Sequence, residues 1–247
     1  VLKLEDLSVK NDRDLMAIKN VSLDIHAGEI LGIAGVAGNG QKELAEAVAG
    51  LRKVVGGTIT INGEDVTTQG AKARVKKRVG FIPEDRLSMG LVPGMNMEEN
   101  RILKEFDLPK FSRHHILKKK VIHDTVQEEI KRYDIKTAGD KSPVSLMSGG
   151  NQQKLLVARE IGGDPVLLIA VYPSRGLDIG AAEAIHEILL EQCRKGVAVL
   201  LISEELDELF QMSDRIGVLC SGEMMAVIDR KEADYDTIGR LMSGEHY

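Results

Sequence analysis

The 247-residue chain lacks the features that mark secreted, membrane-spanning or metal-binding proteins. Its two cysteines, Cys193 and Cys220, have no metal or redox spacing, and their apolar surroundings predict buried free thiols. The six histidines form no metal-ligand pattern, and we expect His114 and His115 at the surface. No apolar run is long enough to span a bilayer, and no basic-then-apolar leader indicates secretion.

The charge balance also argues against nucleic acid as a partner. A formal net charge of −5 argues against general nucleic-acid binding, so we expect no nucleic-acid partner. Two local clusters are basic, one between Lys72 and Arg78 and one at residues 118–120. We interpret both as solvated helix faces, since most such runs are. The chain starts at Val1 within a strand pattern, which we interpret either as a domain cut from a longer polypeptide or as a deliberately trimmed chain.

What is present is an alternation of apolar strands and helices after an antiparallel start. Buried strands that alternate with helices predict a mainly parallel sheet covered on both faces. The predicted strands are 1–4, 21–25, 57–63, 166–171 and 197–202, the helices are 151–161 and 181–195, and a final hairpin joins 216–220 to 224–228.

A helical, polar stretch from about Met97 to Met147 interrupts this rhythm. Within it, mostly apolar side chains recur at helical spacing over residues 113–134, and we predict a helix there. We therefore expect one domain over 1–247 with a helical subdomain inserted at about 86–160. The residues that recur at helical spacing are Leu117, Val121, Thr125, Ile130 and Tyr133.

A glycine-rich loop follows the apolar strand at 30–34 and opens a helix, which is the context of a Walker A phosphate-binding loop. Such a loop binds phosphate with main-chain N–H groups and the helix dipole. A tight strand-to-helix turn would leave the same pattern. The loop consists of Gly35, Val36, Ala37, Gly38, Asn39 and Gly40, and is followed by Gln41 where the motif has lysine, Lys42 where it has serine or threonine, and Glu43.

Two further motifs follow in order. Residues 146–154 (Leu-Met-Ser-Gly-Gly-Asn-Gln-Gln-Lys) precede a helix, and residues 173–178 (Pro-Ser-Arg-Gly-Leu-Asp) follow an apolar strand. With these three motifs the sequence resembles the ABC transporter ATPase family over essentially its whole length. The run after Gly150 and the segments 83–86 and 90–92 look like the branch that serves simple-sugar and nucleoside importers. That branch carries two nucleotide-binding domains in tandem, and this chain looks like the second.

The resemblance implies an α/β P-loop domain of the ABC type, with a mainly parallel core sheet, an N-terminal antiparallel β portion and an inserted helical subdomain. It implies a cytoplasmic location at the membrane face. The implied partners are a tandem N-terminal nucleotide-binding domain, separate transmembrane permease subunits and, indirectly, a solute-binding protein. Residues 81–108 would contact the permease.

The resemblance also assigns roles that several positions do not match. Val171 stands at the Walker B aspartate, Tyr172 at the catalytic glutamate and Glu204 at the switch histidine. Glu84 stands at the Q-loop glutamine, as is usual in the second domain of this branch. The region 9–12 has no aromatic residue to stack on adenine.

These departures predict weak binding of ATP or ADP in cis and very slow or absent hydrolysis, with no catalytic residue intact. The missing lysine removes a charge-assisted contact worth about 1.5–3 kcal/mol. Val171 and Tyr172 cannot support a metal or accept a proton at neutral pH. The sequence leaves two alternatives for Mg²⁺ at this site. Either the ammonium of Lys42 takes the place of the metal, or the Lys42 side chain points to solvent.

The signature motif, which in this family contacts the nucleotide of the partner domain, is intact. The resemblance implies that the signature motif caps the nucleotide of a partner domain and that Asp178 of the D-loop orders the interface. We therefore expect an importer ATP-binding domain whose own site is degenerate. The alternatives are an active ATPase with unorthodox residues, a nucleotide-free interaction or dimerisation module, and a soluble ABC protein of translation or DNA repair. The signature residues are Ser148, Gly149, Gly150, Asn151 and Gln152.

Overall fold

The computed structural model describes residues 1–137, 139 and 141–245. Contacts divide the chain into two compact units. The first comprises Val1–Phe81, Pro165–Tyr172 and Ile188–Tyr247, and the second comprises Ile82–Asp164 and Pro173–Glu187. Within the described ranges, none of the helices combines the length and the apolar content needed to cross a bilayer.

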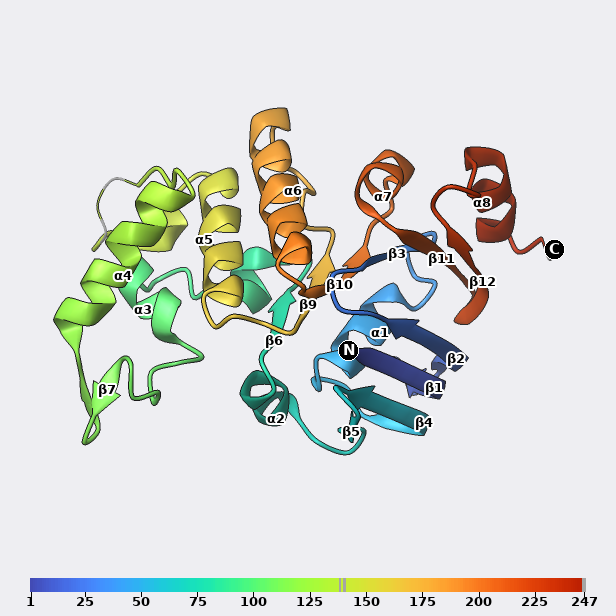
Figure 1. Cartoon of the computed structure of the whole chain (residues 1–247), viewed down its shortest axis with the longest axis horizontal. Coiled ribbons are helices and arrows are strands. Elements are labelled where there is room, and N and C mark those ends of the chain that lie inside the picture. The colour runs from blue at the N-terminus through green and yellow to red at the C-terminus, as the bar shows by residue number, and fades with distance from the viewer. Residues whose placement is uncertain (138, 140, 246–247) are drawn as a thin grey trace. The chain divides into compact units, whose positions relative to one another are not determined.

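A six-stranded sheet forms the centre of the first unit, in the order β12-β11-β3-β10-β9-β6 (Figure 1). The pairs β11–β3, β3–β10 and β10–β9 are parallel, whereas β12 runs antiparallel to β11. Every residue of β3, β9 and β10 is buried, which explains their continuous apolar runs. The strands are β3 (Ile30–Ala34), β6 (Val79–Ile82), β9 (Leu167–Val171), β10 (Ala198–Ile202), β11 (Arg215–Cys220) and β12 (Glu223–Asp229).

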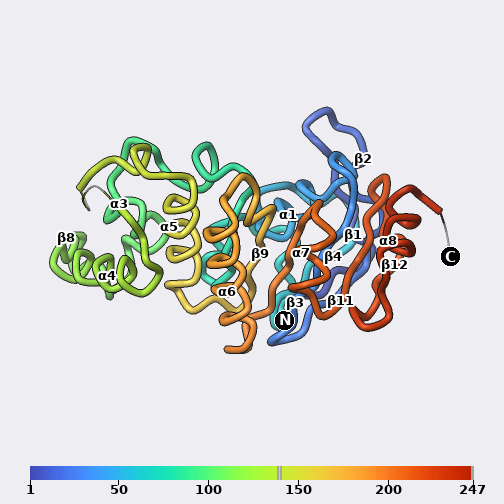
Figure 2. Tube along the Cα trace, turned by 90° about the horizontal axis from the view of Figure 1, so that it is seen from above, coloured from blue at the N-terminus to red at the C-terminus, as the bar shows by residue number. Residues whose placement is uncertain are grey.

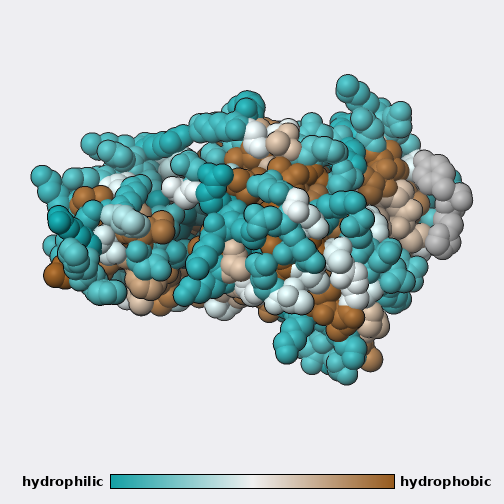
Figure 3. Space-filling view, turned by 60° about the horizontal axis from the view of Figure 1, so that its bottom comes forward, coloured by the Kyte–Doolittle hydropathy of each residue, from teal (hydrophilic) through white to brown (hydrophobic). Residues whose placement is uncertain are grey.

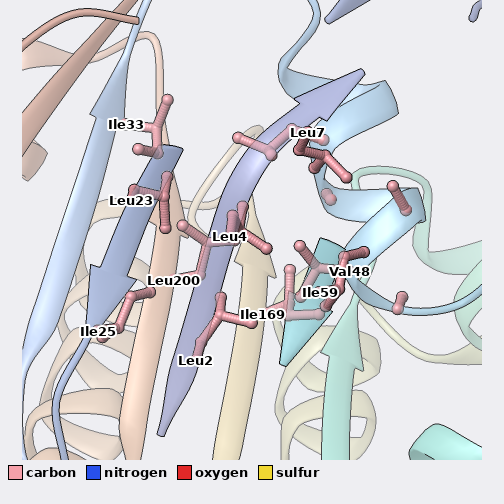
Figure 4. Packing of buried hydrophobic residues seen from close by; sticks show 14 of the residues in the cluster. Leu2, Leu4, Leu7, Leu23, Ile25, Ile33, Val48, Ile59, Ile169 and Leu200 are labelled. Carbon is pink, nitrogen blue, oxygen red and sulfur yellow. The ribbon is translucent and has the colours of Figure 1, made fainter. Parts of the chain in front are cut away.

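An antiparallel sheet in the order β2-β1-β4-β5 completes the first unit, and both sheets share one core with helix α1 (Figure 4). Leu4, Ile59, Val48, Ile169 and Leu200 lie together in that core. The antiparallel strands are β1 (Leu2–Lys10), β2 (Met16–Ile25), β4 (Val54–Ile61) and β5 (Glu64–Asp65), and the helices are α1 (Gln41–Val48), α2 (Ala71–Lys76), α7 (Leu206–Met212) and α8 (Tyr235–Met242).

The predicted fold class is confirmed: a mainly parallel sheet, an antiparallel β portion near the N-terminus and a helical insert. One detail differs, because a second sheet and α1, rather than helices alone, cover one face of the core sheet. Helices α7 and α8 contact the core sheet at β3 and β11.

The second unit is mainly helical, and α3, α4 and α5 are its principal elements (Figure 2). Ion pairs join them: the buried Arg101 of α3 binds Glu129 of α4 at 2.7 Å, and the partly exposed Lys104, just after α3, binds the buried Glu160 of α5 at 2.6 Å. The elements are a π-helical turn (Arg86–Gly90), α3 (Met97–Ile102), β7 (Ser112–Arg113), β8 (Ile116–Leu117), α4 (Lys119–Arg132), a 3-10 turn (Val144–Leu146) and α5 (Gly149–Ile161); α6 (Ile179–Arg194) contributes residues to both units.

The helix predicted over 113–134 is wrong at its start. It begins at Lys119, and the residues before it form the β7–β8 hairpin. His114 and His115 adopt positive φ angles of 49° and 64°, which a continuing helix does not allow. Both histidines are exposed, as expected.

Two further expectations are corrected. Cys193 and Cys220 are partly exposed rather than buried. Arg74 was grouped with the solvated basic cluster, yet it is buried and donates hydrogen bonds to the main-chain oxygens of Val48 and Val66. Those carbonyl acceptors offset part of the cost of removing the guanidinium from water, while its Nη2 is buried without a hydrogen-bond partner. Elsewhere hydrophilic residues cover most of the face seen in Figure 3, and hydrophobic residues form separate patches on it.

Candidate functional site

The glycine loop leaves the carboxyl end of β3 and turns into α1. Residues 36–38 are exposed, and Gly38 and Gly40 have left-handed φ angles of 88° and 106°. A Cβ atom on Gly40 would lie 2.4 Å from the main-chain oxygen of Ala17, so only glycine fits there. The first N–H groups of a helix have no acceptor within the helix. At α1 they adjoin an open loop, which is a geometry that suits a phosphate.

Asn39 braces this loop against the turn between β11 and β12. Its side-chain oxygen accepts a hydrogen bond from Ser221 N at 3.1 Å, and its main-chain oxygen accepts one from Gly222 N at 3.0 Å. Its Nδ2 donates to the main-chain oxygen of Leu219 at 3.4 Å. The sequence predicted that hairpin but carried no signal that its turn supports the loop.

Gln41 fills the inner side of the loop. Its side chain is buried, with 2% exposed, and its Nε2 donates to the main-chain oxygen of Val36 at 3.1 Å. The amide also lies against Gly35, where a Cβ atom would be 2.6 Å from Nε2. A neutral donor therefore occupies the position at which the motif has a cation.

Lys42 lies beside carboxylates rather than alone. Its Nζ is 3.8 Å from Glu46 Oε1 and 4.0 Å from Asp12 Oδ2. Arg52 holds both acids, through 2.7 Å and 2.8 Å hydrogen bonds. The hydrogen bond and charge of Arg52 hold the pKa of Asp12 below its ordinary value. This four-residue network was not foreseen, because its members are spread over residues 12–52.

The positions to which the sequence analysis assigned the Walker B, catalytic and switch roles lie at the same edge of the sheet as the loop. Val171 ends β9 beside Ile202 of β10, and that residue pairs in turn with Ile33 of β3. Val171 is buried, and Tyr172 has a φ angle of 48°, which is unusual for a bulky residue. Tyr172 packs against the core, whereas Glu204 is exposed after β10.

These side chains do not fit Mg²⁺. Magnesium prefers carboxylate, phosphate and water oxygens in octahedral geometry. The side chains of Lys42 and Val171 offer no oxygen, Tyr172 offers a phenol, and Glu204 offers a single exposed carboxylate. Among residues 1–137, 139 and 141–245, no three His, Cys, Asp or Glu side chains form a metal-binding group. The main-chain loop fits a phosphate, but the side chains around it do not fit the metal.

In the second unit, α5 begins at the predicted signature motif. Ser148 is the N-cap, and its hydroxyl accepts a hydrogen bond from Asn151 Nδ2 at 2.8 Å. Gln152 is buried and donates to the main-chain oxygen of Val144 at 3.0 Å. A Cβ atom on Gly149 would lie 2.9 Å from a guanidinium nitrogen of Arg86. This turn is therefore held from several sides.

A side chain has less room at the next position of the signature. A Cβ atom on Gly150 would lie 2.9 Å from the Cβ atom of Ala181, near the start of α6. Asp178 caps that helix, since its Oδ1 accepts a hydrogen bond from Ala181 N at 2.9 Å. The signature and the D-loop residue thus meet at the paired starts of α5 and α6.

The Q-loop position joins the same assembly. Glu84 forms a 2.5 Å ion pair with Arg175, three residues before Asp178. Gln153 donates to the main-chain oxygen of Pro173 at 2.8 Å, which ties the segment to α5. The structure therefore brings the signature, Q-loop and D-loop residues together. The Arg175 contact was missed, because nothing in the spacing of 84 and 175 pairs them.

Comparison with known proteins gives close relatives. The nucleoside import ATP-binding protein NupA of Lactococcus lactis subsp. cremoris is 41% identical over 244 residues, which are 99% of this chain and 48% of that protein. The ribose import ATP-binding protein RbsA of Halalkalibacterium halodurans is 34% identical over 238 residues, 96% of this chain and 47% of that protein. The chain spans about half the length of these curated relatives.

Solved structures show the same fold. The dimeric structure of MJ0796, a bacterial ABC transporter cassette, superposes with a TM-score of 0.79 at 22% identity, over 93% of this chain and 99% of that one. The family profile described as "ABC transporter" matches residues 18–170. With a match to more than half of its length, this chain belongs to the ABC transporter family.

Proposed function

We propose that this chain is the second nucleotide-binding domain of a tandem ATP-binding protein that serves an importer of simple sugars or nucleosides. The relatives are named for nucleoside and ribose import, and this chain spans about half of each. Its own site holds ATP or ADP weakly and hydrolyses it very slowly or not at all. Its signature motif completes the ATP site of the other domain.

One observation supports the proposal: the turn at the start of α5 keeps its serine and glycines, whereas Gln41, Val171 and Tyr172 bring no charged side chain to the loop. Ser148 and Gly149 keep the hydroxyl and the main-chain N–H groups at the start of α5. At the loop edge, Val171 and Tyr172 replace two carboxylates with groups that neither support a metal nor accept a proton at neutral pH. The two halves of an ATP site have thus diverged within one chain.

The charges around the loop support weak binding in cis. Phosphoryl transfer requires cations that neutralise the β- and γ-phosphates and a group that places the water. Gln41 brings no charge, and the ammonium of Lys42 is shared with Glu46 and Asp12. Glu204 adds an exposed anion after β10. The main-chain N–H groups of residues 35–43 remain as the phosphate ligands, apart from that of Asn39, which donates to the main-chain oxygen of Val36 at 3.1 Å.

The partners follow from this division of labour. A tandem N-terminal domain supplies the orthodox Walker A and B residues, and separate permease subunits supply the path for the solute. A solute-binding protein contributes indirectly. In this proposal the chain is a single domain at the cytoplasmic face of the membrane, its helical subdomain spans about 86–160, and residues 81–108 contact the permease.

The test uses the whole polypeptide that contains both halves, with inorganic phosphate release as the readout. Ser148→Arg places a long side chain at the signature and should lower Mg-ATP turnover by more than about a hundredfold. Tyr172→Phe removes only the phenol oxygen from the cis site and should leave turnover within about twofold. Both variants should retain the urea midpoint of the parent, which serves as the folding control.

Two outcomes overturn the proposal. Turnover that survives Ser148→Arg but is abolished by Tyr172→Phe would make this chain a self-sufficient ATPase. No saturable binding of ATP or ADP to the chain, measured by calorimetry, would leave an interaction module without nucleotide.

A further inference from the structure

The β7–β8 hairpin and the start of α4 form a basic, apolar-tipped projection, and we infer that it docks on a membrane surface rich in anionic phospholipid headgroups. The projection comprises residues 108–123. It lies within the second unit and contains none of the nucleotide-site residues. Figures 1 and 2 show β7 and β8 beside the start of α4.

The base of the projection is fixed. Phe111 is fully buried in a small cluster with Ile102 and Ile122. Lys118 closes the hairpin, because its N–H donates to the main-chain oxygen of Phe111 at 2.8 Å and its Nζ donates to that of Pro109 at 2.7 Å. The tip is therefore held in place rather than carried on a loose loop.

The tip presents aliphatic side chains to solvent. Arg113 pairs with Ile116 across the two short strands, and Ile116 is 73% exposed. Leu117 follows at 41%. His114 and His115 form the turn in left-handed conformations, which normally favour glycine or asparagine. The tip therefore combines an unfavourable backbone conformation with apolar side chains that are exposed to solvent.

The cations beside the tip lie at a helix N-terminus, where the helix dipole is unfavourable for positive charge. Lys119 and Lys120 occupy the first turn of α4, which has no acidic residue and whose dipole places positive charge there. Within residues 1–137, 139 and 141–245, the side chains of Arg113, Lys119 and Lys120 have no hydrogen bond or ion pair. An anionic surface would relieve this repulsion.

The charge of the segment contrasts with that of the chain. Residues 108–123 contain five Lys or Arg side chains, three histidines and no carboxylate, in a chain with a net charge of −5. Asp107 and Asp124 flank the segment, and the nearby Glu98 is paired with His123 at 2.8 Å. The positive field is therefore local and faces outward with the tip.

A lipid surface fits these features better than nucleic acid. Basic residues beside exposed aliphatic side chains suit the boundary between headgroups and acyl chains. Proteins that bind single-stranded nucleic acid commonly stack its bases on exposed Phe, Tyr or Trp side chains. The one aromatic ring in residues 108–123 is Phe111, which is buried.

Tryptophan fluorescence gives the first test, since the chain contains no tryptophan. Ile116→Trp should show a blue shift of emission on addition of vesicles that contain 30 mol% phosphatidylserine in phosphatidylcholine, and none with phosphatidylcholine alone. Val55→Trp, at a position 53% exposed in the first unit, is the matched control and should show no shift. No shift for Ile116→Trp, or equal shifts at both positions, would overturn the inference.

Sedimentation with the same vesicles tests the charges. Each cation near such a surface contributes about fivefold to binding, so Lys119→Gln with Lys120→Gln should lower the partition coefficient by roughly twenty-fivefold. Lys72→Gln with Lys76→Gln removes two exposed cations from the first unit and should change it less than about twofold. Equal losses in both pairs, or binding to poly-glutamate or RNA but not to vesicles, would contradict a lipid partner.

Discussion

The side-chain amide of Gln41 donates a hydrogen bond to the main-chain oxygen of Val36, 3.1 Å away, and closes the glycine loop from within. The loop therefore keeps its shape without a lysine, because a neutral donor makes a loop contact. The consequence is electrostatic: the main chain can still receive a phosphate, but no fixed cation from this position reaches it. In this loop the main-chain shape of the motif is present, but the positive charge of its lysine is not.

Restoring the cation should restore affinity but not turnover. In Gln41→Lys a charge-assisted contact to phosphate replaces a neutral amide, which should tighten ATP binding about tenfold to a hundredfold. Calorimetric titration measures the change. Phosphate release should stay at the parent level, because Val171 and Tyr172 are unchanged. A variant that binds no more tightly would show that the loop does not hold the phosphates.

Magnesium should matter little to binding. Lys42 is half exposed and shared with Glu46 and Asp12, so its contribution to a phosphate contact is at most about 1 kcal/mol. Lys42→Ala should therefore weaken ATP binding by no more than about fivefold. Binding with Mg²⁺ or with EDTA should agree within about threefold for the parent chain. Tenfold tighter binding with Mg²⁺, in parent and variant alike, would contradict the conclusion that the side chains around the loop do not fit this metal.

Gly40 should be far less replaceable than Gly38. Both have positive φ, but only at Gly40 would a Cβ atom collide with the main chain, 2.4 Å from the oxygen of Ala17. Gly40→Ala should lower the free energy of unfolding by about 2–4 kcal/mol. Gly38→Ala meets no atom within 4 Å and should cost about 1 kcal/mol. Urea unfolding compares them, and equal costs would refute the collision.

Acid should remove the stabilisation supplied by Glu29. Burial tends to raise its pKa, but hydrogen bonds from Arg215 and His26 outweigh burial and hold the pKa below its ordinary value. The unfolded state then takes up protons first as pH falls. The stabilisation is complete above the ordinary value of about 4.3 and is lost as pH falls through the lower folded value.

The corresponding variant is Glu29→Gln, which should cost about 1.5–3 kcal/mol at pH 7. The cost comes from the weakened 2.5 Å contact with Arg215. In urea unfolding at pH 7 and pH 3.5, the difference between parent and variant should shrink at the lower pH. A difference that grows on acidification would have the wrong sign for a lowered pKa.

The core sheet was predictable because burial on both faces leaves continuous apolar runs such as 167–171 and 198–202. The glycine loop was predictable because its glycine spacing falls between an apolar strand and a helix, which is the context that a phosphate-binding loop requires. The hairpin at 112–117 was not, since Leu117 and Val121 mimic a helical stripe and the turn uses histidines where glycine or asparagine is usual.

The residues around the site divide in the same way. The order of the motifs along the sequence was enough to single out Ser148 and Asp178 as site residues. In the structure they lie at the adjoining starts of α5 and α6. Contacts between distant segments left no pattern: the Glu84–Arg175 pair spans 91 residues, and Asn39 reaches a turn 182 residues away. Such pairs arise from tertiary packing, which local spacing does not encode.

The most direct measurement of the central claim combines binding and hydrolysis on the purified chain. With Mg-ATP, we predict saturable binding and inorganic phosphate release no faster than in protein-free buffer. Rapid, magnesium-dependent phosphate release that Tyr172→Phe abolishes would contradict a cis site that binds nucleotide without cleaving it.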